Sequence, residues 1–525
     1  MKKVSSWREL SLREKIGQTV ICLCETEKHI ALCGSLEKFA EKYPIGGIFN
    51  NGGLVKGLLV DENPDFKKIV DKYNECLRVP LFATADFANY ASKFGVKLPS
   101  QMAVGATDSE ELAYKAGEFI ANDSINSGIN WILWPVCDLS VSDKLPTTVR
   151  ALSDKWDLNA KLVTQEIRAM RDRKVISTLK HFPGCTEIDL DVHLAPTDNN
   201  TPLQLWWDTY GKMYKEIIKE NPPTLMTGHD NFVEYQTEMV DGEYPPATLS
   251  YELTTKLLRD ELGFEGVVVT DALCMGGFTG SNAVDNCVKS FLAGNDVLLW
   301  PAYEYIDEME RRILSGEIDE AVLDKSVERI WNLKKEFGIL DDEVQEARKD
   351  EEFYKEIATS ISHKSLTLIN NYNNMLPLDK EKCKNVLIVA VTPSDVQFEA
   401  LSKLKDNFEK YGCKADVVRN IWTDDLEKLS DKYDNIVFAL CRTFHQPIGP
   451  MDFWGEEATS IWASNASDKN KTMILNFGTP YMYKYYKKSG YTYVNTYAFD
   501  SSTVESVVKA VMGDIEFEGK SSVKL

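Results

Sequence analysis

The chain has 525 residues, which is enough for roughly two to four domains. It carries 81 acidic and 60 basic side chains, and the net charge of −21 argues against a nucleic acid or an anionic membrane as the main partner, because both select basic surfaces. Hydrophobic residues make up 43% of the chain, which supplies large buried cores and excludes a disordered or collagen-like protein.

The N-terminal residues and the cysteines indicate a cytoplasmic protein. Two lysines near the start are not followed by the apolar segment of a signal peptide, and no apolar run reaches the roughly 18 residues that span a bilayer. The 11 cysteines are an odd number without a repeated spacing, which fits free thiols in a reducing compartment better than a disulfide scaffold. We therefore expect a soluble protein in the cytoplasm.

Short apolar runs alternate with helix-length segments over residues 1–345. This alternation forces parallel strand pairing, so we expect an α/β fold in which eight strands close into a TIM-like (β/α)8 barrel. Ser11 and Glu14 have the spacing of a capping box at the first helix, and Ser250 precedes a helical stretch at Tyr251–Leu262. The expected strands are Thr19–Cys24, Gly46–Phe49, Leu81–Ala85, Trp131–Val136, Val175–Leu179, Thr224–Thr227, Gly266–Thr270 and Asp296–Trp300.

A second α/β pattern occupies residues 346–525, after the charged connector Asp341–Glu352. We expect a separate α/β sandwich domain there, with the domain boundary near residue 345. Its loop Phe444–Trp454 is rich in aromatic residues, which favours packing between domains over stacking on a sugar or on a partner subunit. The expected strands are Leu366–Ile369, Val386–Val391, Ile436–Leu440, Met473–Phe477 and Tyr493–Tyr497.

Several apolar runs of the first domain end in ionisable side chains. In a barrel of parallel strands these ends meet on one rim, where active sites of this architecture are built. One such residue would mean little, because strand ends are often polar, but a series along the chain favours a functional site. The residues are Asp86, Asp138, Lys180 with His181, His229 with Asp230, and Asp271.

The segment Lys180–Pro196 contains Pro, Gly and Thr, so we expect a loop over the rim rather than a helix. It carries Glu187, Asp189, Asp191 and His193. In the D-x-H pair, an extended backbone puts both side chains on one side, so that Asp191 orients His193 and raises its basicity for general acid–base catalysis. Taken alone, such a pair is more often a structural hydrogen bond, and it is the place at the rim that favours catalysis.

Asp271 ends the apolar run V-V-V-T and precedes A-L-C-M-G-G. A partly desolvated carboxylate at a strand end, near Lys180 and Arg150, could stay ionised and attack an anomeric carbon. The alternative is that Asp271 caps the helix that follows it. The rim position favours the nucleophile.

These segments, in chain order, resemble family 3 of the glycoside hydrolases. The resemblance is carried by K-H-F-P-G (Lys180–Gly184), the D-x-H pair, P-A-T-L-S (Pro246–Ser250) and G-F-E-G-V-V-V-T-D-A-L-C-M (Gly263–Met275). It extends from S-L-R-E-K-I-G-Q (Ser11–Gln18) to K-S-L-T-L-I-N-N-Y-N-N-M-L-P-L (Lys364–Leu378), and so covers nearly the whole chain. The branch that it resembles most is that of the cytoplasmic β-N-acetylglucosaminidases.

The resemblance implies a retaining exo-glycosidase that removes non-reducing-end N-acetyl-β-D-glucosamine from glycosides derived from peptidoglycan or chitin. It implies that Asp271 forms a covalent glycosyl-enzyme, and that His193, held by Asp191, protonates the leaving oxygen and later activates water. From a site lined by Lys, Arg and His we expect no metal and no organic cofactor, and a homodimer stays open. By position, the sugar-binding residues would be Asp86, Asp138, Arg150, Lys180, His181 and Met226.

The chain departs from the family pattern at the walls of the expected sugar site. The family's G-H-G-D-T is G-C-T-E-I here (Gly184–Ile188), D-Q-E-G-G is D-F-A-N-Y (Asp86–Tyr90), and S-D-D-L is T-D-A-L. These changes keep the three expected catalytic residues and leave the exact sugar, linkage and aglycone open.

Other functions fit parts of the same pattern. A β-glucosidase would use the same residues on a different sugar. A phosphorolytic enzyme would also use them, because a histidine, unlike a carboxylate, does not repel an incoming phosphate. A degenerate homologue would bind sugar without turnover; the altered segments favour it, whereas the retained nucleophile and dyad do not. A zinc hydrolase typically needs H-x-H after the first strand, where this chain has C-L-C-E (Cys22–Glu25).

Overall fold

The structure is a computed structural model, and it describes residues 3–50, 66–86, 92, 94–142, 150–186, 190–278, 283–341, 345–443 and 452–525. The chain forms two compact units. The first consists of Met1–Lys93, Gly117–Asp138 and Val163–Lys349, and the second of Phe94–Ala116, Leu139–Leu162 and Asp350–Leu525. The second unit therefore contains residues 94–116 and 139–162, which the sequence analysis assigns to the first domain.

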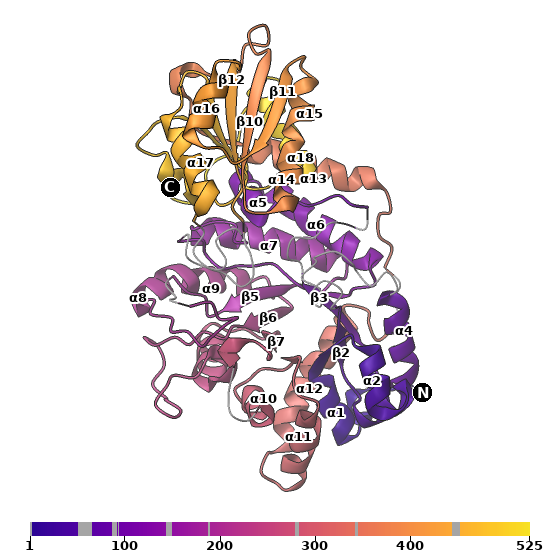
Figure 1. The fold of residues 1–525 in the computed structure, drawn as a ribbon. Coiled ribbons are helices and arrows are strands. Elements are labelled where there is room, and N and C mark those ends of the chain that lie inside the picture. Colours follow the sequence, from indigo (N-terminus) through magenta and orange to yellow (C-terminus); the bar gives the residue numbers. More distant parts are fainter. Residues whose placement is uncertain are drawn as a thin grey trace. The chain divides into compact units, whose positions relative to one another are not determined.

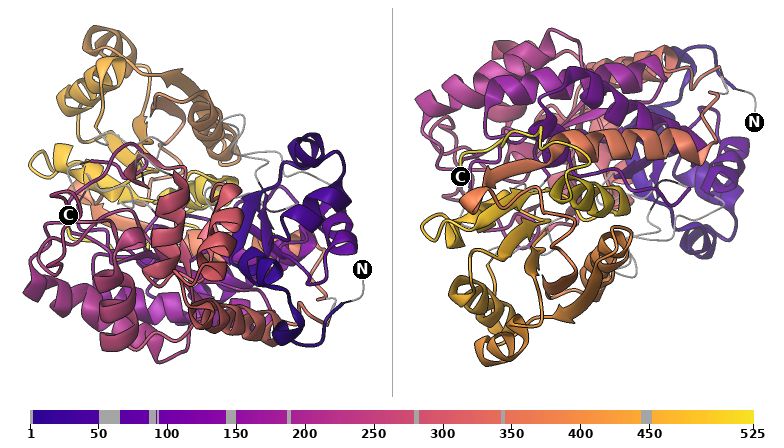
Figure 2. Two further views of the ribbon diagram at one scale, coloured as in Figure 1. Left: turned by 90° about the horizontal axis from the view of Figure 1, so that it is seen from below. Right: turned by 90° about the horizontal axis from the view of Figure 1, so that it is seen from above.

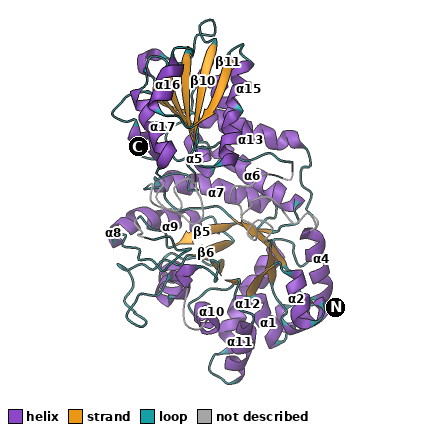
Figure 3. Cartoon of the chain, in the orientation of Figure 1, coloured by secondary structure: helices purple, strands orange, loops and turns teal. Residues whose placement is uncertain are grey.

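The eight strands expected in the first unit form, and they pair in parallel. They build a five-stranded sheet of order β4-β3-β2-β1-β8 and a three-stranded sheet of order β5-β6-β7 (Figure 3). Single parallel bridges join Trp131 of β4 to Ile176, just before β5, and Val269 of β7 to Val297, just before β8. Each bridge links an edge of one sheet to an edge of the other. The strands are β1 (Val20–Leu23), β2 (Gly47–Phe49), β3 (Phe82–Asp86), β4 (Trp131–Leu133), β5 (Thr178–Phe182), β6 (Thr224–Thr227), β7 (Val267–Thr270) and β8 (Leu298–Leu299).

Two helices of this unit have the polar start signals that the sequence predicts. The capping box of Ser11 and Glu14 is confirmed, with the Ser11 N–H donating to the Glu14 carboxylate at 2.8 Å. The Ser250 Oγ accepts the Leu253 N–H at 3.2 Å, at the start of a π-helix. The main helices are α1 (Leu12–Gln18), α2 (Thr26–Cys33), α3 (Leu36–Lys42), α4 (Phe66–Cys76), α6 (Glu110–Asn126), α7 (Trp156–Asp172), α8 (Leu203–Trp206), α9 (Lys212–Ile218), the π-helix η4 (Glu252–Glu261), α10 (Ala283–Leu292), α11 (Glu304–Leu314) and α12 (Glu320–Glu336).

An apolar core fills the space between these strands. It includes Ile21 of β1, Phe82 of β3, Met226 of β6 and Val269 of β7, with Leu333 contributed by α12. The apolar side chains of the strands are buried in this core, and the polar residues come after the carboxyl ends of the strands. Among the described residues, no helix is both long and apolar enough to cross a membrane.

The second unit contains a six-stranded sheet of order β11-β10-β12-β13-β14-β9, parallel except for β9 (Figure 1). Apolar clusters lie on both faces of the sheet: α14, α15 and α18 contribute to one cluster, and α16 and α17 to the other. The orange and yellow segments of Figure 2 show the ribbon of residues 350–525 from two further directions. The strands are β9 (Thr367–Asn370), β10 (Asn385–Val391), β11 (Lys414–Arg419), β12 (Asn435–Leu440), β13 (Thr472–Asn476) and β14 (Thr492–Asn495). The helices are α5 (Gln101–Thr107), α13 (Glu351–Ser365), α14 (Asp395–Ser402), α15 (Leu404–Glu409), α16 (Thr423–Ser430), α17 (Gly455–Ala466) and α18 (Ser501–Val511).

Strand β11 does not follow from the sequence pattern. Its residues K-A-D-V-V-R are polar at both ends, and most of them are only partly buried because the strand forms one edge of the sheet. An edge strand is not forced to be a continuous apolar run, so its pattern resembles that of a loop.

Candidate active site

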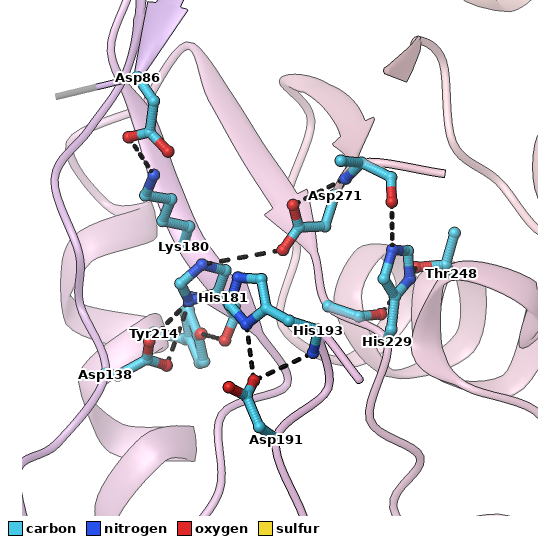
Figure 4. Close-up of polar contacts among 12 residues, drawn as sticks. Asp86, Asp138, Lys180, His181, Asp191, His193, Tyr214, His229, Thr248 and Asp271 are labelled. Carbon is cyan, nitrogen blue, oxygen red and sulfur yellow. Dashed lines mark hydrogen bonds and ion pairs between the residues drawn. The ribbon is translucent and has the colours of Figure 1, made fainter. Parts of the chain in front are cut away.

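Asp271 follows β7 directly, and its carboxylate points toward two histidines (Figure 4). Its Oδ2 lies 3.9 Å from Nε2 of His181, and its Oδ1 accepts the Ala272 N–H at 2.7 Å. The next described helix, the short 3-10 helix η5, begins only at Gly276. The carboxylate therefore does not cap a helix, and the capping alternative does not describe Asp271.

Positive charge around Asp271 keeps its carboxylate ionised. Burial by itself raises the pKa of this group. Three nearby histidines and the Ala272 N–H outweigh burial and lower the pKa of Asp271 to about 2. The histidines are His181, His229 and His193, so histidines supply the positive charge that was expected from Lys180 and Arg150.

Asp191 and His193 form the expected pair, but through a turn. Nδ1 of His193 lies 2.6 Å from Oδ1 of Asp191, and the same oxygen accepts the His193 backbone N–H at 3.0 Å. The expected extended backbone is wrong, because residues 192–194 form a turn in which the Leu194 N–H donates to the Asp191 carbonyl at 2.9 Å. Since Nδ1 is held by the carboxylate, Nε2 is the ring nitrogen that would exchange a proton with a substrate.

Two side chains at the end of β5 are each held by a carboxylate. Nζ of Lys180 donates to Oδ1 of Asp86 at 2.7 Å, and the lysine side chain is 2% exposed whereas that of Asp86 is 40% exposed. Nδ1 of His181 lies 2.7 Å from Oδ2 of Asp138, whose other oxygen accepts the His181 backbone N–H at 3.3 Å. The ends of β3 and the segment after β4 thus orient two neighbouring side chains at the rim.

His229 does not present its ring nitrogens to the Asp271 carboxylate, although it follows β6. Its Nε2 lies 3.0 Å from the Ala272 carbonyl oxygen, which can only accept, so Nε2 carries a proton and donates. Its Nδ1 lies 2.9 Å from Oγ1 of Thr248. Burial lowers the pKa of His229, and both ring nitrogens are engaged by the backbone and by Thr248, so this histidine holds the backbone rather than moving a proton.

Cys185 belongs to a segment in which the chain departs from the family pattern, and it lies close enough to Asp230 for the two groups to interact electrostatically. Burial raises the pKa of the Cys185 thiol well above its ordinary value, and the charges of Asp230 and Asp138 raise it further. Burial also raises the pKa of Asp230 to about 7, with added repulsion from Asp138 and Asp271. The thiol therefore stays protonated, and Asp230 is a carboxyl group that titrates near neutral pH.

The remaining expected residues lie elsewhere or outside the described part. Met226 is 1% exposed and packs in the apolar core, and Arg150 belongs to the second unit, so a sugar contact stays a prediction for both. Glu187 and Asp189, residues 87–90, and residues 444–451 of the aromatic loop lie outside the described residues. Within the described residues, no three His, Cys, Asp or Glu side chains are grouped so that they could hold a metal ion.

The family follows from comparison with known proteins. The sequence profile "Glycosyl hydrolase family 3 N terminal domain" matches residues 11–333, and the chain belongs to this family. A "Beta-N-acetylglucosaminidase/beta-glucosidase" of Cellulomonas fimi is 26% identical over 401 residues, which are 72% of this chain and 68% of the relative. "Beta-hexosaminidase A" of Pseudoalteromonas piscicida is 30% identical over 286 residues, which are 49% of this chain and 48% of the relative.

Solved structures show the same fold at low sequence identity. A family 3 β-N-acetylglucosaminidase from Paenibacillus sp. str. FPU-7 matches with a TM-score of 0.81 and 24% identity, covering 98% of this chain and 99% of that one. The β-glucoside phosphorylase BglX matches with a TM-score of 0.83 and 24% identity, covering 98% of this chain and 94% of that one. At these identities the likeness identifies the fold and not the substrate.

Proposed function

We propose that this family 3 member is a retaining exo-glycosidase that removes N-acetyl-β-D-glucosamine from the non-reducing ends of glycosides derived from peptidoglycan or chitin. The observation that carries the proposal is the Asp271 carboxylate at the end of β7 together with a nearby His193, whose Nδ1 lies 2.6 Å from Asp191. A carboxylate nucleophile and a separate proton shuttle are the two groups that a retaining double displacement needs.

In the first step, Asp271 attacks the anomeric carbon while His193 gives a proton from Nε2 to the leaving oxygen. The bond to the aglycone breaks as the ester bond to Asp271 forms. In the second step, His193 takes a proton from water, whose oxygen attacks the same carbon and releases the sugar and Asp271. Asp191 stabilises the imidazolium form that exists before the first step and after the second.

The sugar binds, in this proposal, between the two carboxylate-held side chains and Asp271. Lys180 donates to Asp86 at 2.7 Å and His181 lies 2.7 Å from Asp138, so both are oriented before a sugar arrives. Groups fixed in this way lose little conformational entropy when they bind hydroxyl groups. The choice of N-acetylglucosamine rests on similarity to the β-N-acetylglucosaminidase/β-glucosidase of Cellulomonas fimi and the β-hexosaminidase A of Pseudoalteromonas piscicida.

A panel of p-nitrophenyl β-glycosides tests the proposal. We expect fastest hydrolysis of the N-acetylglucosaminide, with the activity lost in Asp271→Ala. A clear preference for the glucoside or the xyloside would replace the substrate and keep the mechanism. Absence of turnover with every glycoside, together with measurable sugar binding, would support a degenerate sugar-binding homologue instead.

Phosphorolysis is the second candidate, and the identity of the proton shuttle favours it. A neutral imidazole at His193 does not repel a phosphate dianion, whereas a carboxylate at that place would. A protein of the same fold is named a β-glucoside phosphorylase. The reaction should be run with and without inorganic phosphate; a glycosyl-1-phosphate product supports phosphorolysis, and its absence leaves hydrolysis.

The architecture that we propose around this site is a closed (β/α)8 barrel followed by an α/β sandwich. The parallel bridges from Trp131 to Ile176 and from Val269 to Val297 support closure, because each links an edge of one sheet to an edge of the other. In a closed barrel, Asp138, His181 and Asp271 come from ends that face one cavity.

A further inference from the structure

The loop that carries His193 is bonded to the segment that follows Asp271. The Gly276 N–H donates to the His193 carbonyl at 2.9 Å, and the Gly277 N–H donates to the Val192 carbonyl at 2.9 Å. Main-chain hydrogen bonds thus connect the proton shuttle to the strand end that supplies the nucleophile.

Glycine is required at both positions because the two segments approach very closely. An ideal Cβ on Gly276 would lie 2.2 Å from the Leu194 carbonyl oxygen, and one on Gly277 would lie 2.8 Å from that of Val192. Optimal contacts of carbon are about 3.5–4.0 Å, and these carbonyl oxygens are backbone atoms that cannot rotate away. A Cβ on Gly277 would also lie 2.9 Å from Cβ of His229. An alanine at either position would therefore push the loop at residues 191–194 outward.

His229 holds the same segment from the other side (Figure 4). Its Nε2 donates to the Ala272 carbonyl at 3.0 Å, and its ring packs against Phe278 with centroids 5.5 Å apart. Thr248, from the P-A-T-L-S motif, contacts Nδ1 of His229 at 2.9 Å and donates its hydroxyl to the Gly228 carbonyl at 2.7 Å. The segment is therefore fixed near both of its ends.

We propose that Ala272–Phe278 is a positioning platform that sets the distance between Asp271 and His193. His229 fixes the platform behind the nucleophile, and Gly276 with Gly277 dock the loop of the proton shuttle onto it. This inference rests on the proposed function, because it takes Asp271 as the nucleophile and His193 as the proton shuttle. It assigns a role to Gly276, Gly277 and His229, which contact neither the reacting atoms nor the sugar in this account.

The test is Gly277→Ala with a series of aryl β-N-acetylglucosaminides whose phenols differ in acidity. A displaced His193 cannot protonate the leaving oxygen, so kcat/KM should fall about 100-fold for a weakly acidic phenol. A strongly acidic phenol leaves without a proton, so kcat/KM for the dinitrophenyl substrate should stay within about twofold. With that substrate kcat and KM should fall together, because hydrolysis of the glycosyl-enzyme becomes slow without a base to deprotonate water, and this intermediate accumulates.

Two control variants keep the outcomes apart. His193→Ala should show the same dependence on the phenol, more strongly; if it shows none, the proposed function fails rather than the platform. Gly266→Ala adds equal crowding at the opposite end of β7, where an ideal Cβ would lie 2.7 Å from the Pro223 carbonyl oxygen, and it should show no such dependence. Equal slowing of all substrates by Gly277→Ala, or the same dependence in Gly266→Ala, would overturn the platform.

Hydrogen exchange of the unaltered protein tests the same idea without relying on a folded variant. The amides of Gly276 and Gly277 should exchange slowly and lose protection together, since both donate to one loop. Rapid exchange of both amides in an active enzyme would contradict the docking.

Discussion

Nε2 of His181 lies 3.9 Å from Oδ2 of Asp271, while Nδ1 of the same ring lies 2.7 Å from Asp138. The imidazole of His181 therefore connects the proposed nucleophile to the buried carboxylate of Asp138, which follows β4. The electrostatic interaction with His181 lowers the pKa of Asp271 and so helps to keep that carboxylate ionised. The nucleophile thus depends on a residue that it does not contact.

Asp138→Asn tests this dependence. The amide keeps the size of the side chain but removes the charge that holds His181, so the ring loses orientation. A hydrogen bond to a charged group contributes about 1.5–3 kcal/mol, and we expect kcat/KM to fall roughly 10- to 100-fold. Steady-state kinetics with the N-acetylglucosaminide measure it, with the melting temperature as a check on folding. Unchanged kinetics would show that His181 needs no carboxylate.

Asp191→Asn tests the role of the dyad. The loss of charge weakens the 2.6 Å contact to Nδ1 of His193, and the turn at residues 192–194 loses part of its support. We expect kcat/KM to fall by about 10- to 100-fold for weakly acidic phenols and much less for strongly acidic ones. The aryl glycoside series measures this difference. A uniform loss across the series would mean that Asp191 only stabilises the loop.

Asp230→Asn should change how stability varies with pH. Burial raises the pKa of Asp230 from 3.8 to about 7, so between these values the folded protein keeps a proton that the unfolded chain releases. The proton's stabilising effect is complete below about pH 4 and is lost as the pH rises through about 7. The uncharged asparagine does not undergo this loss. The free energy of unfolding of the variant, minus that of the original protein, should therefore be about 2–4 kcal/mol larger at pH 8 than at pH 5. Urea unfolding at both pH values measures it; a gain that is equal at both would contradict the raised pKa.

Asp296→Asn should lower stability without changing catalysis. Asp296 is fully buried ahead of β8, and accepts from Arg259 at 2.7 Å, Arg329 at 2.9 Å and the Val268 N–H at 2.9 Å. The asparagine leaves the largely buried Arg259 without its charge partner, which costs about 3–5 kcal/mol. Denaturant unfolding should show this loss while kcat per folded molecule stays constant. A fall in kcat without a loss of stability would assign Asp296 to the site.

The strand ends of the first unit could be predicted because buried parallel strands are apolar runs of fixed direction. Strand β6 has the expected bounds, Thr224–Thr227, and Asp138, His181 and Asp271 lie together as their strand-end positions require. The edge strand β11 could not be predicted in this way, because half-exposed strands lack a continuous apolar pattern.

The contacts that orient the site were harder to predict. The direction of His229 depends on Thr248 and on the Ala272 carbonyl, which are distant in sequence. The turn at Asp191 replaces an extended segment because its carboxylate bonds nearby backbone. The assignment of Arg150 to the second unit reflects chain segments that leave the first unit and return to it, and no local pattern signals this.

The central claim is that Asp271 forms a covalent bond to the sugar. The most direct measurement is to trap that intermediate with a 5-fluoro-N-acetyl-β-D-glucosaminyl fluoride, digest the protein and locate the labelled peptide by mass spectrometry. We predict a single label on Asp271, in the peptide that contains V-V-V-T-D-A-L, and none in Asp271→Ala. A label on another carboxylate, or rapid turnover of the reagent with inversion at the anomeric carbon, would contradict the account.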